Sequence, residues 1–301
     1  MIVDVQNFGM TFGKNTIVRD LSFDVAAGET FGLLGSNGSG KTTTLRALLG
    51  TIAPTRGTLH INGQTYHAGA DTKVGYLPEE RGLYRKDSAI EIMSYFGELK
   101  GLPRQQARAW SSRYLGRVGL GEKARVRLER LSGGQQQKIQ LGIAIMGEPD
   151  LLILDEPAKG LDPVNRRLLM ELIAERREAG SAVILVTHNM DEVERLCSRA
   201  LLLKDGRAEA YGTVRDIQSS MGSRRIRMRL SGPIPESLLF HVVSRRVDEI
   251  IIEPTQGVAD EEILEFLVTS GARPNLFEPR SASLEEVFLK VYGNTPQEVN
   301  A

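Results

Sequence analysis

The sequence lacks the features typical of secreted and membrane-spanning proteins. Cys197 is the single cysteine, which excludes an intrachain disulfide and is typical of a reducing compartment. The most apolar runs, at residues 151–157 and 181–188, are far shorter than the ~20 residues that a membrane-spanning helix needs. The first ten residues lack the charge and apolar pattern of a signal peptide. We therefore expect a soluble cytoplasmic chain, whose role at a membrane would need a partner that supplies the spans.

The sequence also has no excess charge of either sign. It carries 38 Lys and Arg against 38 Asp and Glu, so no global basic field favours nucleic acid as a partner. A length of 301 residues allows one large α/β domain or two domains with a substantial core.

Short apolar runs indicate strands in the first part of the chain, and helical periodicity indicates helices between them. Ile92, Phe96 and Leu99 form one stripe of a helical segment that begins at Ser88. After Ser132, helices alternate with apolar strands, which predicts a parallel sheet covered on both faces. The strands expected in this first part are residues 1–10, 17–25, 29–35, 57–63, 151–155, 182–188 and 199–206.

The composition of the chain changes near residue 220. Residues 219–225, SSMGSRR, are small and basic, which is typical of a linker. Beyond it, strands are expected at 225–230, 247–254 and 273–279, and helices at 260–271 and 283–293. We therefore expect a first domain at residues 1–218, with a helical part at about 85–146, and a small α+β domain at 224–293.

Residues 35–43, GSNGSGKTT, lie between an expected strand and an expected helix. The spacing G-x4-G-K-[ST] lets backbone N–H groups surround a phosphate at a helix N-terminus, with Lys41 as a positive charge and Thr42 as a magnesium ligand. A Gly/Ser turn before a helix is the simpler alternative, but the strand-loop-helix context favours nucleotide binding. The expected phosphate-binding residues are Gly35, Ser36, Asn37, Gly38, Ser39, Gly40, Lys41, Thr42 and Thr43.

The apolar strand LLILD ends in Asp155 and is followed by Glu156. Ligands bind outside the carboxyl ends of parallel strands, so Asp155 is a candidate magnesium ligand and Glu156 a candidate base for an attacking water. His188 lies at the corresponding end of the expected strand at 182–188, although a lone His is more often a surface or structural residue.

Residues 131–138, LSGGQQQK, place two glycines at a helix start without the lysine of a phosphate loop. Together, GSNGSGKTT, LSGGQ, LLILDEP, GLDP and TH resemble, in order and spacing, the nucleotide-binding subunit of ATP-binding cassette (ABC) transporters over about residues 1–218. The resemblance implies a P-loop NTPase cassette with a mostly parallel core sheet, antiparallel N-terminal strands and a helical insert.

The resemblance also implies an ATPase that binds ATP and Mg²⁺ in a head-to-tail dimer, expected to consist of identical chains, beside a multispanning permease on the cytoplasmic face of the membrane. Glu156 and His188 would act in hydrolysis, and Phe12, otherwise an ordinary core residue, would stack on adenine. Residues that would contact ATP across the dimer, or couple its two sites, are Ser132, Gly133, Gly134, Gln135 and Asp162.

The ending SLEEVFLKVYG, with YLPEERGLY and GLDPVN, resembles the ABC-2 exporter subgroup, which includes sodium-efflux and drug-efflux systems. An importer cassette with a regulatory C-terminal domain and a soluble ABC-type ATPase acting on ribosomes or DNA remain alternatives. One departure is PAKGLDP, where the family usually has Ser or Thr before the first Gly.

A second departure is Glu79, which stands where most cassettes have a magnesium-contacting Gln. A carboxylate can accept a hydrogen bond from magnesium-bound water but cannot donate one. Its charge beside Asp155 and Glu156 would be costly without the ion, and Arg81 is expected to offset part of it. The alternative is a solvated acidic loop.

Overall fold

The computed structural model describes residues 1–67, 71–80, 82, 85–222, 224–246, 249–280 and 282–293. The chain divides into two compact units, Met1–Gly212 and Thr213–Ala301, each with its own hydrophobic core. This division falls before α7 (Val214–Met221), which packs against α9 (Leu284–Tyr292), whereas the sequence suggested a linker near residue 220. In the part of the chain that is described, no helix has the length and apolar character needed to cross a bilayer.

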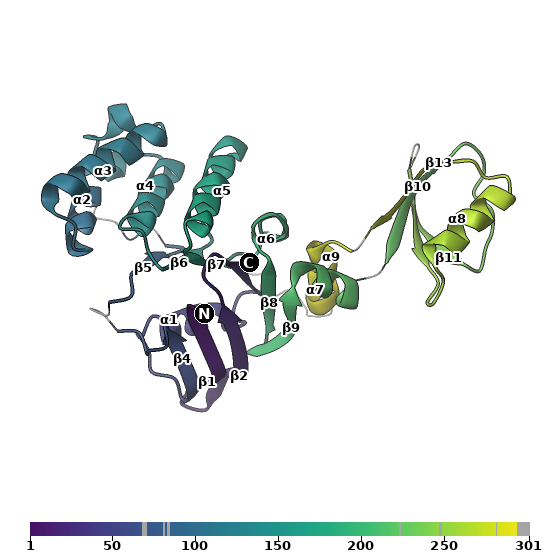
Figure 1. Ribbon diagram of the computed structural model, residues 1–301, viewed down its shortest axis with the longest axis horizontal. Coiled ribbons are helices and arrows are strands. Elements are labelled where there is room, and N and C mark those ends of the chain that lie inside the picture. Colours follow the sequence, from purple (N-terminus) through teal and green to yellow (C-terminus); the bar gives the residue numbers. More distant parts are fainter. Residues whose placement is uncertain are drawn as a thin grey trace, which may run out of the picture. The chain divides into compact units, whose positions relative to one another are not determined.

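The central sheet of the first unit has the strand order β5-β6-β7-β3-β8-β9. Figure 1 labels all of these strands except β3. Adjacent strands from β5 to β8 are parallel. β3, β6 and β7 are buried along their whole length, as expected for parallel strands covered on both faces. The strands are β3 (Thr30–Leu34), β5 (Val74–Leu77), β6 (Leu151–Asp155), β7 (Ala182–Val186), β8 (Arg199–Lys204) and β9 (Arg207–Thr213).

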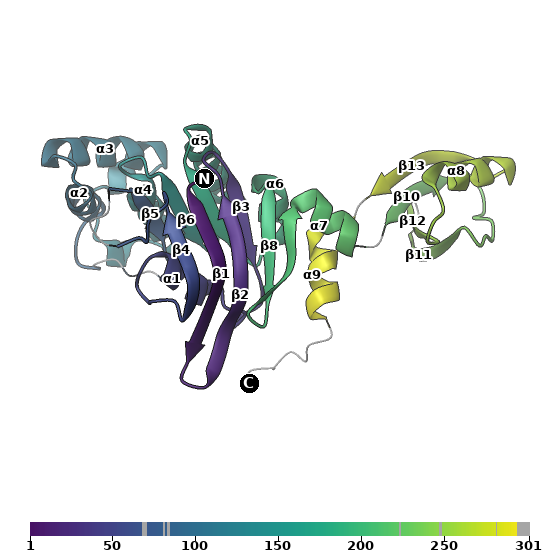
Figure 2. The ribbon, with the colours of Figure 1, turned by 60° about the horizontal axis from the view of Figure 1, so that its bottom comes forward.

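A smaller antiparallel sheet carries the N-terminus, in the order β2-β1-β4 (Figure 2). Its strands are β1 (Val3–Phe12), β2 (Asn15–Val25) and β4 (Arg56–Ile61). Its apolar side chains share one core with β3, β6 and β7 and with α1 (Lys41–Leu48). The expected mixture of antiparallel N-terminal strands and a parallel core is confirmed.

Between β5 and β6 the chain forms α2 (Ala89–Leu99), α3 (Arg104–Arg117) and α4 (Gly133–Ile145), which pack on one another (Figure 1). Short 3-10 turns at Gly121–Lys123 and Leu128–Arg130 connect α3 to α4. The expected stripe on α2 is wrong at its end. Leu99 is exposed, because the buried face runs through Ile92, Met93 and Gly97, and Gly97 lies against Ala107 of α3.

Two further helices follow the strands β6 and β7, namely α5 (Pro163–Glu178) and α6 (Met190–Leu196). Asp162 caps α5 by accepting a hydrogen bond from the N–H of Asn165, and Pro163 is the first residue of the helix. Gly180, with a φ of 97°, follows the end of the helix.

The second unit contains an antiparallel sheet in the order β11-β12-β10-β13. Its elements are β10 (Arg225–Leu230), β11 (Phe240–Arg246), β12 (Glu249–Pro254), α8 (Asp260–Thr269) and β13 (Pro274–Arg280). Side chains of β10 and β12 form a core with Ile263 and Leu267 of α8. The sequence did not predict β11, because this edge strand is mostly exposed and lacks an alternating apolar pattern.

We predict that Ile252→Ala destabilises the second unit and leaves the first unit unchanged. Ile252 of β12 is fully buried, so its truncation removes about 2 to 5 kcal/mol of stability from that core. Amide hydrogen exchange should accelerate in β10 and β12 but not in β6 and β7. Val242→Ala on β11 is the control, since that side chain is exposed. Equal acceleration in both units would contradict the prediction.

Candidate functional site

The phosphate-loop sequence connects β3 to α1 in the structure. Gly40 precedes the helix with a φ of 111°, which side chains rarely adopt, and a Cβ on Gly35 would collide with the Ser39 side chain. The Lys41 ammonium donates hydrogen bonds to the carbonyl oxygens of Gly35, at 2.8 Å, and Ser36, at 2.9 Å. The loop therefore has the glycine-dependent, tightly wound geometry that the motif predicts, with a positive charge held against it.

The acids at the end of β6 share the electrostatic environment of this lysine. Burial raises the pKa of Asp155 to about 6, and the charges of Glu79 and Glu156 act in the same direction. Burial lowers the pKa of Lys41, while Glu156, Asp155 and Glu79 oppose that shift. The carboxylates of Asp155, Glu156 and Glu79 therefore lie close enough to Lys41 to interact with its charge.

Glu156 has a left-handed backbone (φ 48°), which is unusual for a residue other than glycine. This conformation directs its carboxylate toward the end of β7, where it accepts a hydrogen bond from the backbone N–H of His188 at 2.9 Å. The Nδ1 atom of the His188 ring lies 2.7 Å from the same carboxylate oxygen. The structure therefore brings together the two residues that the sequence suggested for hydrolysis.

Thr187 connects Glu156 to a buried acid that the sequence did not suggest. Its hydroxyl lies 3.3 Å from a carboxylate oxygen of Glu156 and 3.3 Å from one of Glu192, and it also accepts a hydrogen bond from the N–H of Asn189. One hydroxyl proton cannot serve two carboxylates. Burial raises the pKa of Glu192, and a proton on that carboxyl could be donated to the Thr187 hydroxyl, which could then donate its own proton to Glu156.

The LSGGQ sequence forms the N-terminus of α4. The hydroxyl of Ser132 accepts a hydrogen bond from the N–H of Gln135, whose side-chain oxygen accepts one from the N–H of Ser132. Gly133 and Gly134 occupy the first turn. This reciprocal cap fixes the start of the helix, where the dipole favours an anionic ligand.

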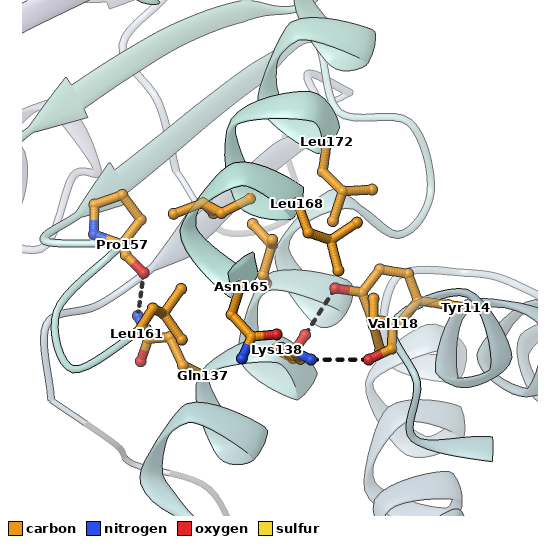
Figure 3. A pocket seen from close by; sticks show the side chains of 11 residues that line it. Tyr114, Val118, Gln137, Lys138, Pro157, Leu161, Asn165, Leu168 and Leu172 are labelled. Carbon is orange, nitrogen blue, oxygen red and sulfur yellow. Dashed lines mark hydrogen bonds between the residues drawn. The ribbon is translucent and has the colours of Figure 1, made fainter. Parts of the chain in front are cut away.

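Figure 3 shows how α4 is anchored behind this start. The side-chain amide of Gln137 donates to the carbonyl oxygen of Pro157 at 3.0 Å. Lys138 donates to the carbonyl oxygen of Val118 at 2.9 Å, and the hydroxyl of Tyr114 donates to the carbonyl oxygen of Lys138 at 2.8 Å. The helix is thus tied both to α3 and to the turn that follows β6.

The remaining candidate residues lie at the ends of their elements. Phe12 ends β1 and is 51% exposed, as a stacking residue needs to be and a core residue is not. Glu79 follows β5 and forms an ion pair with Lys159, with 2.7 Å between Oε1 and Nζ. Arg81, the expected partner of Glu79, lies outside the described residues.

The donor atoms fit a magnesium ion that arrives with a phosphate ligand. Thr42, Glu79 and Asp155 offer hard oxygen donors, which Mg²⁺ prefers. Among the described residues, no group of three or more His, Cys, Asp or Glu could hold a metal by itself. In nucleotide sites, Mg²⁺ is usually held by one or two carboxylates together with substrate phosphates.

Comparisons with known proteins decide the family. The family model described as ABC transporter matches residues 18–159, and one described as the DrrA1-3-like ATP-binding protein C-terminal domain matches residues 212–292. The linearmycin resistance ATP-binding protein LnrL of Bacillus subtilis (strain 168) is 32% identical, covering 98% of this chain and 99% of the relative. The chain belongs to the ATP-binding subunits of ABC transporters.

Two further similarities agree with this assignment. The Nod factor export ATP-binding protein I of Paraburkholderia xenovorans (strain LB400) is 36% identical, with 96% of each chain covered. A solved structure of the ATP-binding subunit of an ABC transporter matches with a TM-score of 0.66 and 30% identity, covering 72% of this chain and 92% of that chain. Members of the family bind and hydrolyse ATP, and they typically dimerise and pair with a membrane permease.

The sequence offered weaker signals for Lys159 and Glu192. Lys159 differs from the residue expected from the family resemblance. Its ion-pair partner, Glu79, lies 80 residues away in the chain, so the sequence did not predict the contact. Glu192 lies in an ordinary amphipathic helix, α6, and only the fold shows that it is buried beside Thr187.

We predict that Glu192→Gln stabilises the protein increasingly as the pH rises. Burial raises the pKa of Glu192 above its usual value of 4.5, so the folded protein keeps this proton to a higher pH than the unfolded chain does. The stability contributed by the carboxyl therefore falls as the pH increases from about 4.5 through the folded pKa, and glutamine avoids that loss. Thermal unfolding between pH 4.5 and 7.5 measures the difference from the wild type.

Glu194→Gln is the matched control for this prediction, because Glu194 lies on the same helix and is exposed. Its difference from the wild type should stay constant over the same pH range. The same trend in both variants would show that the burial of Glu192 does not cause the effect.

Proposed function

We propose that this chain is the ATP-hydrolysing motor of an ABC exporter and works as a dimer of two identical copies. In this dimer, residues 35–43 of one copy and residues 132–135 of the other hold each ATP between them. A separate multispanning permease carries the cargo, and the motor acts on it from the cytoplasmic face of the membrane. The cargo itself need not contact this chain.

The observation that carries the proposal is the contact between Glu156 and His188 beside the phosphate loop. A carboxylate fixed by two hydrogen bonds from the same residue is oriented to accept a proton from a water molecule that attacks the terminal phosphate. Lys41 supplies positive charge to the phosphates from the neighbouring loop. In this proposal, Lys41 serves phosphate binding, and Glu156 and His188 serve hydrolysis.

The same arrangement assigns residues to the metal. Thr42, Asp155 and Glu79 would hold Mg²⁺, either directly or through water. When bound, the ion offsets the negative charge of the phosphate oxygens. The ion would also offset the charges of Glu79 and Glu156, which add to the effect of burial in raising the pKa of Asp155.

The capped start of α4 supports the dimer. The first-turn N–H groups at Gly133 and Gly134, beside the hydroxyl of Ser132, make an anion site. A second chain would supply the phosphate for this site, and Asp162 at the start of α5 would couple the two sites. ATP can then do mechanical work by binding the closed dimer more tightly than the open one.

Two relatives whose names mention resistance or export support the direction of transport. The similarities to the linearmycin resistance protein and to the Nod factor export protein extend over nearly the whole of this chain. They therefore include the C-terminal unit as well as the cassette. This favours an exporter over an importer cassette or an ATPase that acts on ribosomes or DNA.

We predict that Glu156→Gln lowers ATP turnover by roughly 10²-fold to 10⁴-fold, because the attacking water loses its base. ATP affinity should remain close to that of the wild type, since the phosphate loop is intact. Steady-state phosphate release and nucleotide titration measure the two effects separately. Size-exclusion chromatography with Mg²⁺ and ATP should also show a dimer that accumulates in this variant. Near-normal turnover would remove Glu156 from this role.

We predict that Lys41→Ala weakens nucleotide binding itself, by roughly tenfold or more, because the phosphates lose a charge-assisted hydrogen bond. Titration with ATP measures the affinity. Unchanged affinity in this variant would contradict the assignment of residues 35–43 as the phosphate site.

Purification of the chain from membranes tests the transporter assignment as a whole. A multispanning protein should be recovered together with it. Recovery only with ribosomes or DNA would contradict the proposal.

A further inference from the structure

Glu79 and Lys159 join the two loops that leave β5 and β6. The strands are adjacent and parallel, so both loops begin at the same edge of the sheet. Glu79 lies two residues beyond the end of β5, and Lys159 lies four residues beyond the end of β6. Their charged atoms are 2.7 Å apart.

Buried side chains of α4 hold both loops in place. Gln137 donates to the carbonyl oxygen of Pro157 in the loop after β6 (Figure 3), and Gln140 donates to the carbonyl oxygen of Glu80 in the loop after β5. Both glutamines are almost completely buried. The positions of the loops therefore do not depend on the ion pair that lies between them.

The ion pair itself is partly solvated, with side-chain exposures of 47% for Glu79 and 58% for Lys159. Pairs with this exposure contribute little to folding stability. The effect of this pair is therefore expected in the nucleotide site, where Glu79 and Lys159 act on Asp155 with opposite signs. Removing Lys159 alone would take away the positive charge closest to Glu79, so that Glu79 would place more net negative charge beside Asp155.

We propose that Lys159 is a positioning residue that holds the carboxylate of Glu79 and offsets its charge. An acidic residue can then occupy this position without repelling the phosphates of ATP before a divalent cation is bound. The inference rests on the proposed function, because it takes residues 35–43, Asp155 and Glu156 as the site for ATP. Its distinct content is that Lys159 acts through Glu79 and not by direct contact with the nucleotide.

The proposal predicts a dependence on magnesium. Without a divalent cation, Lys159→Ala should weaken ATP binding by roughly threefold to fivefold, the size expected for one partly exposed charge pair. With Mg²⁺ the loss should be smaller, because the ion takes over the compensation of Glu79. Lys159→Arg should restore the wild-type affinity, since it keeps the charge.

The test is a titration of the full-length chain with a fluorescent ATP analogue, once in EDTA and once in excess MgCl₂. The variants are Lys159→Ala, Glu79→Gln and the two combined. The combined variant should bind as Glu79→Gln does in both conditions. Lys123→Ala is the matched control, because it removes an exposed positive charge from the 3-10 turn after α3. Thermal unfolding should give nearly the same midpoint for all variants.

Three outcomes would overturn the inference. These are an unchanged affinity in Lys159→Ala without cation, an equal loss in Lys123→Ala, and a loss in the combined variant as large as in Lys159→Ala. The last would show that Lys159 contacts the nucleotide independently of Glu79. Failure of the proposed function would look different, because the wild-type chain and Lys41→Ala would then bind the analogue equally weakly.

Discussion

The parallel register of β6 between β5 and β7 is the constraint on which the nucleotide site depends. Leu154 pairs with Leu77 on one side and with Leu185 on the other, so the three strands end at one edge of the sheet. β3 pairs with β7 in the same direction, and the phosphate loop leaves it at that edge. Lys41, Asp155 and His188 belong to distant parts of the sequence, and strand alignment alone brings them together.

Much of this arrangement could be predicted from the sequence, because its parts are local. The phosphate loop has a fixed spacing and needs glycine where side chains do not fit, as Gly40 shows. The uninterrupted apolar strands of the core identify buried parallel strands, and Asp162 with Pro163 identifies the start of α5. In each case the local backbone conformation requires particular residue types at neighbouring positions, and these can be recognised in the sequence.

Contacts between loops that are distant in the chain require no recognisable pattern of neighbouring residues. The sequence showed that Glu79 and Lys159 were unusual, but not that β5 lies beside β6, which places the two residues in contact. Thr187 and Glu192 likewise meet only through the fold. The edge strand β11 was missed for a related reason. Its order comes from hydrogen bonds to β12 rather than from a buried apolar face, so its own residues are mostly exposed.

Two residues of the candidate nucleotide site are held in conformations or surroundings that are unfavourable for them. Asp155 is buried beside other acids, and Glu156 has a strained backbone. Such costs are tolerated because the fully buried strands β3, β6 and β7 hold the site in place. A ligand that brings compensating charge binds the folded chain alone and therefore stabilises it. Through Gln137 and Gln140, α4 contacts the loops on both sides of Asp155. A displacement of α4 would thus reach the loop that contains Glu79 and the loop that follows Asp155, two candidate metal ligands.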